Sequence, residues 1–148
     1  MNILKKLKRI KPLIRAKKAL VDKETLTLSQ IIQEKIAAQN ELHRCQQAYM
    51  QGINELNKQR SSEYRTGQDY MEKSVDYARD LWTNLFRETQ VLDNKIAAQR
   101  AVLFNAKLQL KEIEKLHERY EIEFQKLANK QEQNFLDEFH LGTRMRQK

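Results

Sequence analysis

Apolar residues recur along the chain with a spacing that alternates between three and four positions. In the second half, sixteen seam positions run from Val75 to Leu127, and thirteen of them are apolar. In the first half, every seventh residue from Leu7 to Leu56 is apolar in seven of eight cases, the exception being Lys35. A 3.5-residue spacing held over this length is typical of a coiled coil. The pattern therefore predicts two long amphipathic helices.

One segment near the middle of the chain carries turn chemistry. Residues 60–69, RSSEYRTGQD, combine serine, threonine, glycine and aspartate, the residues that favour turns. A break there makes an all-α fold, a long antiparallel two-helix coiled-coil hairpin that occupies residues 1–148 as a single domain. The expected boundaries are a first helix at about 3–60, a turn at about 61–68, a second helix at about 69–140 and a basic tail at 142–148. Gly142 is the expected C-cap of the second helix.

A hairpin also fixes which residues face one another. If facing residues have numbers that sum to 127, Cys45 lies opposite Trp82 and Tyr49 opposite Ala78, so that large side chains meet small ones. Lys35 also falls in the seam, and its long stem is expected to lie along the seam while its charge reaches water.

The composition agrees with long helices, and it favours a reducing compartment over export or insertion in a membrane. Charged residues make up 32% of the chain, and neither glycine nor proline occurs between Gly67 and Gly142, so few turns are possible. A single cysteine favours a reducing compartment over a disulfide scaffold. The longest apolar run, residues 101–104, is too short for a signal peptide or a membrane span. A soluble, cytoplasmic protein is expected.

The positive charge is concentrated at the start of the chain. Residues 1–23 hold nine lysines and arginines and one acid, so their net charge equals the +8 of the whole chain. This segment is a candidate contact site for an acidic partner. It could bind nucleic acid or a ribosome through phosphates, or dock in an acidic protein cavity. It could also lie on an anionic membrane surface through one apolar stripe, formed by Ile3, Leu7, Ile10 and Ile14.

A second candidate contact site lies near the end of the chain. The predicted seam stops at Leu127, and apolar residues resume on another helical face. These residues are Phe135, Leu136, Phe139 and Leu141. An apolar patch without a partner in the hairpin suggests docking to another protein. The alternative is that the patch folds back onto Ile3 and Leu4.

Nothing in the sequence points to catalysis, a metal or a cofactor. Three scattered glycines do not make a phosphate-binding loop. His43, His117 and His140 are not arranged with carboxylates or with Cys45 at ligand spacing. We expect Cys45 to be a small seam residue and His117 a polar interruption of the seam opposite Ile10.

The C-terminal sequence resembles a known family. The residues that carry the resemblance are LHER at 116–119, Asn129, Gln133, LDEF at 136–139, Arg144, Met145 and Arg146. Together with the length, the hairpin layout and the basic start, they resemble the YscO/FliJ family of central stalk proteins. These proteins belong to type III secretion systems and to the flagellar export apparatus. The strongly basic start is closer to the virulence-type branch.

The resemblance implies a role that is not enzymatic. Such proteins insert the paired end of the hairpin into the pore of a hexameric ATPase, stimulate it and reach towards the export gate, and some of them escort secretion chaperones. They are bacterial and cytoplasmic, at the periphery of the inner-membrane secretion apparatus. By transfer, the ATPase would contact Lys5, Lys6, Lys8, Arg9, Phe135, Leu136, Asp137, Glu138, Phe139, Arg144 and Arg146. The export gate would contact Tyr64, Tyr70, Tyr77 and Leu81.

Overall fold

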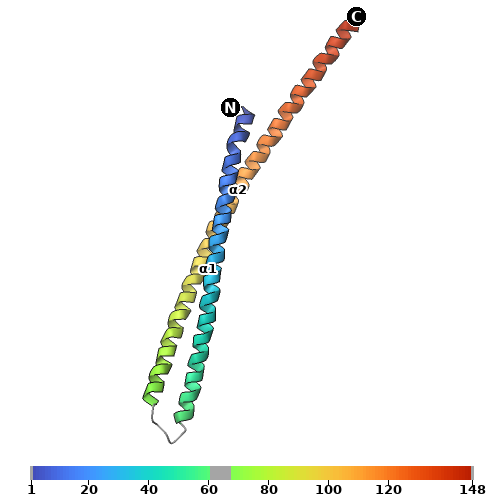
Figure 1. The fold of residues 1–148 in the computed structure, drawn as a ribbon. Coiled ribbons are helices and arrows are strands. Elements are labelled where there is room, and N and C mark those ends of the chain that lie inside the picture. Colours follow the sequence, from blue (N-terminus) through green and yellow to red (C-terminus); the bar gives the residue numbers. More distant parts are fainter. Residues whose placement is uncertain (1, 61–67, 148) are drawn as a thin grey trace. The chain divides into compact units, whose positions relative to one another are not determined.

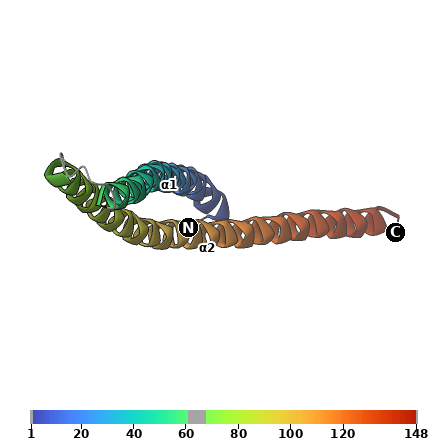
Figure 2. The same ribbon diagram turned by 90° about the horizontal axis from the view of Figure 1, so that it is seen from below.

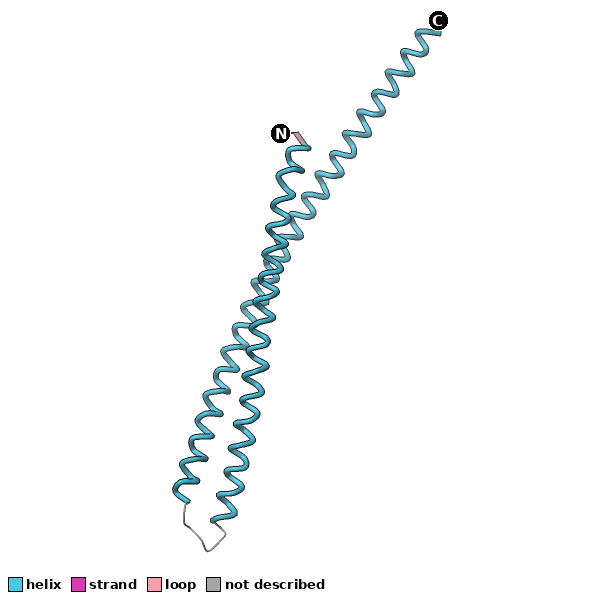
Figure 3. The backbone as a smooth tube through the Cα atoms, in the orientation of Figure 1, coloured by secondary structure: helices cyan, strands magenta, loops and turns pink. Residues whose placement is uncertain are grey.

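The computed structural model describes residues 2–60 and 68–147, and within these ranges the chain is almost entirely helical. Helix α1 spans Ile3–Arg60 and helix α2 spans Gln68–Gln147, and the described residues contain no strand (Figures 1 and 3). The prediction of an all-α fold with two long helices is confirmed. The predicted turn at 61–68 falls outside the described residues, apart from Gln68.

The second helix ends later than the sequence predicted. Helix α2 continues through Gly142 to Gln147, so the expected C-cap at Gly142 and the separate tail from 142 are wrong. A single glycine costs a helix only about 1 kcal/mol relative to alanine. Next to Gly142, the Thr143 hydroxyl donates a hydrogen bond to the Phe139 carbonyl at 2.9 Å, one turn earlier in the same helix.

The chain divides into two compact units, each made of one segment of α1 and one of α2. We call residues 24–102 the central unit and residues 1–23 with 103–148 the terminal unit. In the central unit, Lys35 pairs with Asp93 and Arg60 with Glu72, so residues later in α1 meet residues earlier in α2. The two segments are therefore antiparallel. The assignment of residues 1–148 to one domain stays a prediction.

The terminal unit has the same antiparallel arrangement. Lys17 Nζ donates to Gln109 Oε1 at 2.8 Å, and Lys6 lies over the ring of Tyr120. Residues earlier in α1 thus meet residues later in α2.

The buried side chains all occupy predicted seam positions. They are Ile10, Cys45, Leu56, Thr89, Ile96, Leu103 and Ala106. Thr89 is the polar member, and its hydroxyl donates to the Leu85 carbonyl at 2.9 Å, so burial leaves no unmade hydrogen bond there.

The seam ends about two turns earlier than predicted, at Tyr120. Phe124 and Leu127 continue the apolar spacing of α2, yet both side chains are exposed. Phe124 borders an open hollow against Leu4 and Leu7 of α1 and is not packed tightly against them.

Charged residues in the seam find partners across it. We expected the charge of Lys35 to reach water. Instead, Lys35 Nζ lies 2.5 Å from Asp93 Oδ1 and pairs with the facing helix. Glu24 in turn accepts a hydrogen bond from the Gln99 amide through its carboxylate and another, at 3.1 Å, through its backbone carbonyl.

The register is close to the predicted one, with local differences. The Tyr49 ring stacks on Trp82 with 5.8 Å between ring centroids, although the predicted pairing placed Tyr49 opposite Ala78. Gly52 and Val75 do face each other, as a sum of 127 requires. A Cβ atom added at Gly52 would lie 3.0 Å from Val75 Cγ2, so the glycine permits a close approach of the two helices.

We therefore expect Gly52→Ala to be coupled to the side chain at position 75. The substitution gains helix propensity of about 1 kcal/mol but crowds Val75. In a Val75→Ala background the crowding is gone, so Gly52→Ala should be more favourable there by about 0.5–1 kcal/mol. Urea unfolding followed by circular dichroism would measure this coupling. Gly142→Ala is the control, because nothing lies within 4 Å of its added Cβ and its effect should not depend on Val75.

Candidate functional site

The start of α1 is fixed by local hydrogen bonds. The Asn2 carbonyl accepts from the backbone N–H groups of Lys5 and Lys6 at 3.1 and 3.2 Å. The Asn2 side-chain oxygen accepts from the Leu4 N–H at 3.4 Å, which is typical of a helix N-cap. The basic residues that follow are therefore presented from an ordered helical turn.

The four basic candidates at this end are not equivalent. Lys5, Lys8 and Arg9 are exposed, whereas Lys6 is half-buried with its Nζ 5.4 Å from the centroid of the Tyr120 ring. An ammonium at this distance is attracted to the face of the ring. Lys6 therefore helps to hold α1 on α2.

The apolar stripe proposed for a membrane surface is occupied. Ile10 is buried, and Ile3, Leu7 and Ile14 are half-buried in the seam against α2. These side chains are not available to a lipid surface, so the apolar basis of that interpretation is lost. Neither helix, over the residues described, contains a stretch long and apolar enough to cross a membrane.

The C-terminal candidates lie on an unpaired part of α2. Every described side chain from 121 to 144 is exposed, including Phe135 at 68% and Phe139 at 63%. Leu136, Leu141, Glu138 and Arg144 are also exposed. The patch does not fold back onto Ile3 and Leu4, and that alternative is wrong.

Short-range contacts order this part of α2. The Gln133 amide donates to Asp137 at 3.3 Å, and the rings of Phe139 and His140 meet edge to face at 6.3 Å. The side chain of Arg146 lies outside the described residues. The basic and apolar candidates both belong to the terminal unit, and the C-terminal part of α2 extends beyond the start of α1 (Figures 1 and 2).

Two hollows flank the first turns of α1. One, of about 430 Å³, is lined by Lys8, Lys11 and His117 among others. The other, of about 240 Å³, is lined by Arg9 and Leu13 among others. The residues transferred from the family as ATPase contacts did not include Lys11, His117 or Leu13, although Lys11 and Leu13 lie in the basic segment 1–23. The spacing of three and four residues along each helix could have indicated which of them share a face with the candidates.

The candidates for the export gate lie in the central unit. Tyr70, Tyr77 and Leu81 are exposed on α2, and Tyr64 falls outside the described residues. Tyr77 and Leu81 border a hollow of about 230 Å³ whose lining contains no charged side chain. The remaining lining residues are Cys45, Ala48, Gly52, Ser74, Val75 and Ala78. Cys45 is buried there as a small seam residue, as expected.

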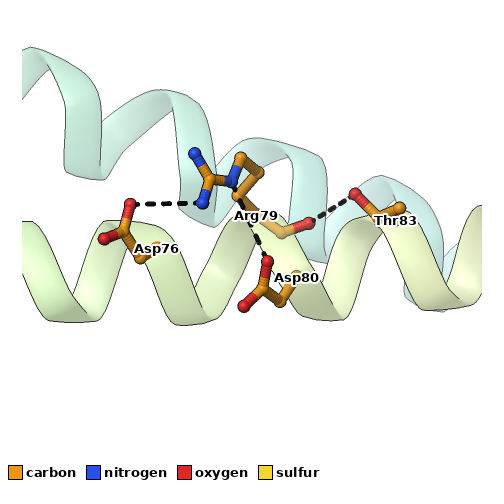
Figure 4. A network of polar contacts seen from close by, with 4 residues as sticks. All are labelled: Asp76, Arg79, Asp80 and Thr83. Atoms are coloured by element: carbon orange, nitrogen blue, oxygen red, sulfur yellow. Dashed lines mark hydrogen bonds and ion pairs between the residues drawn. The ribbon is translucent and has the colours of Figure 1, made fainter.

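The same segment of α2 also carries a polar face. Arg79 lies 3.6 Å from Asp76 and 3.9 Å from Asp80, and the Thr83 hydroxyl donates to the Arg79 carbonyl (Figure 4). These contacts are local to α2 and exposed, so each contributes little to stability.

The described histidines do not form a ligand cluster. Across residues 2–60 and 68–147, no group of three His, Cys, Asp or Glu side chains is placed to hold a metal ion. His43 and His140 are exposed, and His117 lies half-buried with its Nε2 3.5 Å from Glu121 Oε1.

A family model described as "Flagellar FliJ protein" matches residues 6–148. The match covers nearly the whole chain, including most of the basic start and all of the exposed end of α2. No curated protein and no solved structure gives a significant match.

Proposed function

The chain belongs to the FliJ family of flagellar and type III export proteins, and from this premise we propose that it is a coupling stalk. It inserts the paired end of its hairpin into a hexameric export ATPase, stimulates ATP hydrolysis and links the ATPase to the export gate. Members of the family are non-enzymatic export components. The observation that carries the proposal is the chemistry of the terminal unit, where exposed basic residues start α1 and an exposed aromatic patch ends α2.

The proposed ATPase contacts have two kinds of chemistry. Lys5, Lys8 and Arg9 supply positive charge, which steers an acidic pore towards them over a distance. Phe135 and Phe139 supply large apolar area, which is typical of the few residues that dominate binding energy. Lys6, Leu136, Asp137, Glu138, Arg144 and Arg146 complete the proposed contact set.

The proposed gate contacts are Tyr70, Tyr77 and Leu81 on α2 in the central unit, together with Tyr64, which lies outside the described residues. The protein would then work in the bacterial cytoplasm, at the periphery of the inner-membrane apparatus, and would also escort secretion chaperones. The basic start favours a virulence-type secretion system over a flagellar one.

The test of the ATPase role uses the full chain and the export ATPase of the same bacterium. The chain should co-purify with the assembled hexamer and raise its rate of ATP hydrolysis. Absence of both effects would overturn the proposal. If the chain instead bound RNA tightly, with an affinity that falls steeply with salt and without any effect on the ATPase, the alternative of a nucleic-acid or ribosome-binding arm would replace it.

If Tyr77 and Leu81 contact the export gate, substituting them should weaken binding of the gate protein. Tyr77→Ala together with Leu81→Ala should weaken capture of the soluble domain of the gate protein by about tenfold, since exposed aromatic anchors carry much of the energy of such contacts. Pull-down at several gate concentrations measures the change. Phe86→Ala is the control, because Phe86 is also exposed and lies nine positions after Tyr77, on the opposite side of the helix. Equal losses for both variants would contradict the assignment.

A further inference from the structure

The larger hollow of the terminal unit forms where α1 starts and α2 continues past it. Helix α1 contributes Leu4, Leu7, Lys8 and Lys11, and α2 contributes His117, Glu121, Phe124 and Gln125. On α1, Leu4, Lys8 and Lys11 are three or four positions apart, and on α2, His117, Glu121 and Phe124 are, so each set shares one helical face. Leu7 and Gln125 are each adjacent in sequence to a member of these sets. The hollow has a volume of about 430 Å³.

Its lining combines positive charge with apolar surface. Lys8 and Lys11 are exposed at its edge, and neither forms an ion pair within the described part of the chain. Leu4 and Phe124 are exposed apolar side chains on either side of it. Glu121 is the one acid among the lining residues.

His117 adds a polar atom that lacks a hydrogen bond. Its Nε2 atom is buried and has no hydrogen-bond partner in the structure, and Glu121 Oε1 lies 3.5 Å away without the geometry of a hydrogen bond. A buried polar atom without a partner is unfavourable. The exposed ammonium groups of Lys8 and Lys11 can both donate to one negatively charged group at the edge of the hollow.

We propose that this hollow receives a segment of a partner protein that presents a carboxylate next to a large apolar side chain. The carboxylate would lie between Lys8 and Lys11, and the apolar side chain would cover Leu4 and Phe124. This proposal rests on the proposed function, because the partner is taken to be the export ATPase. It adds Lys11, His117, Leu4 and Phe124 to the contact set and defines the chemistry of the partner's surface.

The first experiment identifies what occupies the hollow. The photo-crosslinking residue p-benzoylphenylalanine replaces Leu4 in the full chain, and the complex with the ATPase hexamer is irradiated. Mass spectrometry should find an ATPase peptide with an Asp or Glu next to an apolar residue. The same replacement at Leu13 is the control, because Leu13 is similarly exposed (52% against 44% for Leu4) and lies nine positions away, on the opposite face of α1. It should yield a different peptide or none.

The second experiment separates this hollow from general positive charge. Lys8→Gln with Lys11→Gln should weaken ATPase binding about tenfold more than Arg15→Gln with Lys18→Gln. Both pairs remove two exposed charges at the same three-residue spacing on α1.

The outcomes distinguish the two proposals. If the wild-type chain binds the ATPase but both double variants are equally weakened, the hollow is not the site and the coupling role stands. The same holds if Leu4 crosslinks to a peptide without an acid, or to a second copy of this chain. If the wild-type chain does not bind the ATPase at all, the coupling role is wrong, and so is the assignment of the hollow as an ATPase contact.

Discussion

Ile96→Ala is expected to lower the free energy of unfolding by about 2–4 kcal/mol, the usual range for truncating a buried isoleucine. Ile96 is only 6% exposed in the seam between the two helices. Alanine has the higher helix propensity, but that gain of a few tenths of a kcal/mol is far smaller than the loss. The described residues include no large side chain that is fully buried, so no deeper core compensates. Urea unfolding followed by circular dichroism measures the change.

Ile36→Ala is the matched control for this prediction. The substitution is chemically identical, but Ile36 is 44% exposed. Its effect should stay within about 0.5 kcal/mol of zero, as for most surface positions. If both variants lost the same stability, burial in the seam would not be what holds α1 and α2 together.

The seam was predictable because helical periodicity is a geometric property of one helix. Ile96 and Leu103 fall on the 3.5-residue spacing, and both are buried. Phe124 obeys the same spacing and is exposed, because its burial depends on how closely the facing residues of α1 pack against it, and it borders an open hollow with Leu4 and Leu7. The pattern within one helix carries no information about how closely its neighbour packs.

The side-chain pairs across the seam were less predictable than the seam itself. A facing register places residues to within about one turn, and the choice among neighbours then depends on shape and charge. Tyr49 stacks on Trp82 because two flat rings pack well together, and Lys35 pairs with Asp93 because an opposite charge is within reach. Neither preference follows from periodicity.

The candidate site was predictable in its charge and not in its geometry. The excess of bases before residue 24 is evident in the sequence. That Lys6 is held by Tyr120, and that Lys11 shares a hollow with His117, depends on contacts between residues at opposite ends of the chain. The exposed patch around Phe139 was expected to lack a partner within the hairpin, and in the structure it is exposed.

Neutralising Lys5, Lys6, Lys8 and Arg9 together, each as glutamine, is expected to slow association with the ATPase by about 100-fold and to remove its stimulation. Electrostatic steering accelerates association by about 10- to 1000-fold, and these residues carry four of the nine positive charges before residue 24. Stopped-flow binding and the rate of ATP hydrolysis measure the two effects. Lys6→Gln also removes the contact with Tyr120, so circular dichroism must first establish that the variant is folded.

The control is a second quadruple variant, which changes the net charge by the same amount through substitutions on α2. Glutamine at Lys107, Lys111, Lys115 and Lys126 also removes four exposed positive charges from the terminal unit. If only total charge mattered, the two sets would slow association equally, and added salt would slow the wild-type chain in the same way. If the start of α1 enters an acidic pore, only the substitutions at Lys5, Lys6, Lys8 and Arg9 should slow association strongly. Charges inside the pore are less screened by salt than charges that remain exposed to solvent. A first set that binds and stimulates like the wild-type chain would exclude docking through this end of the protein.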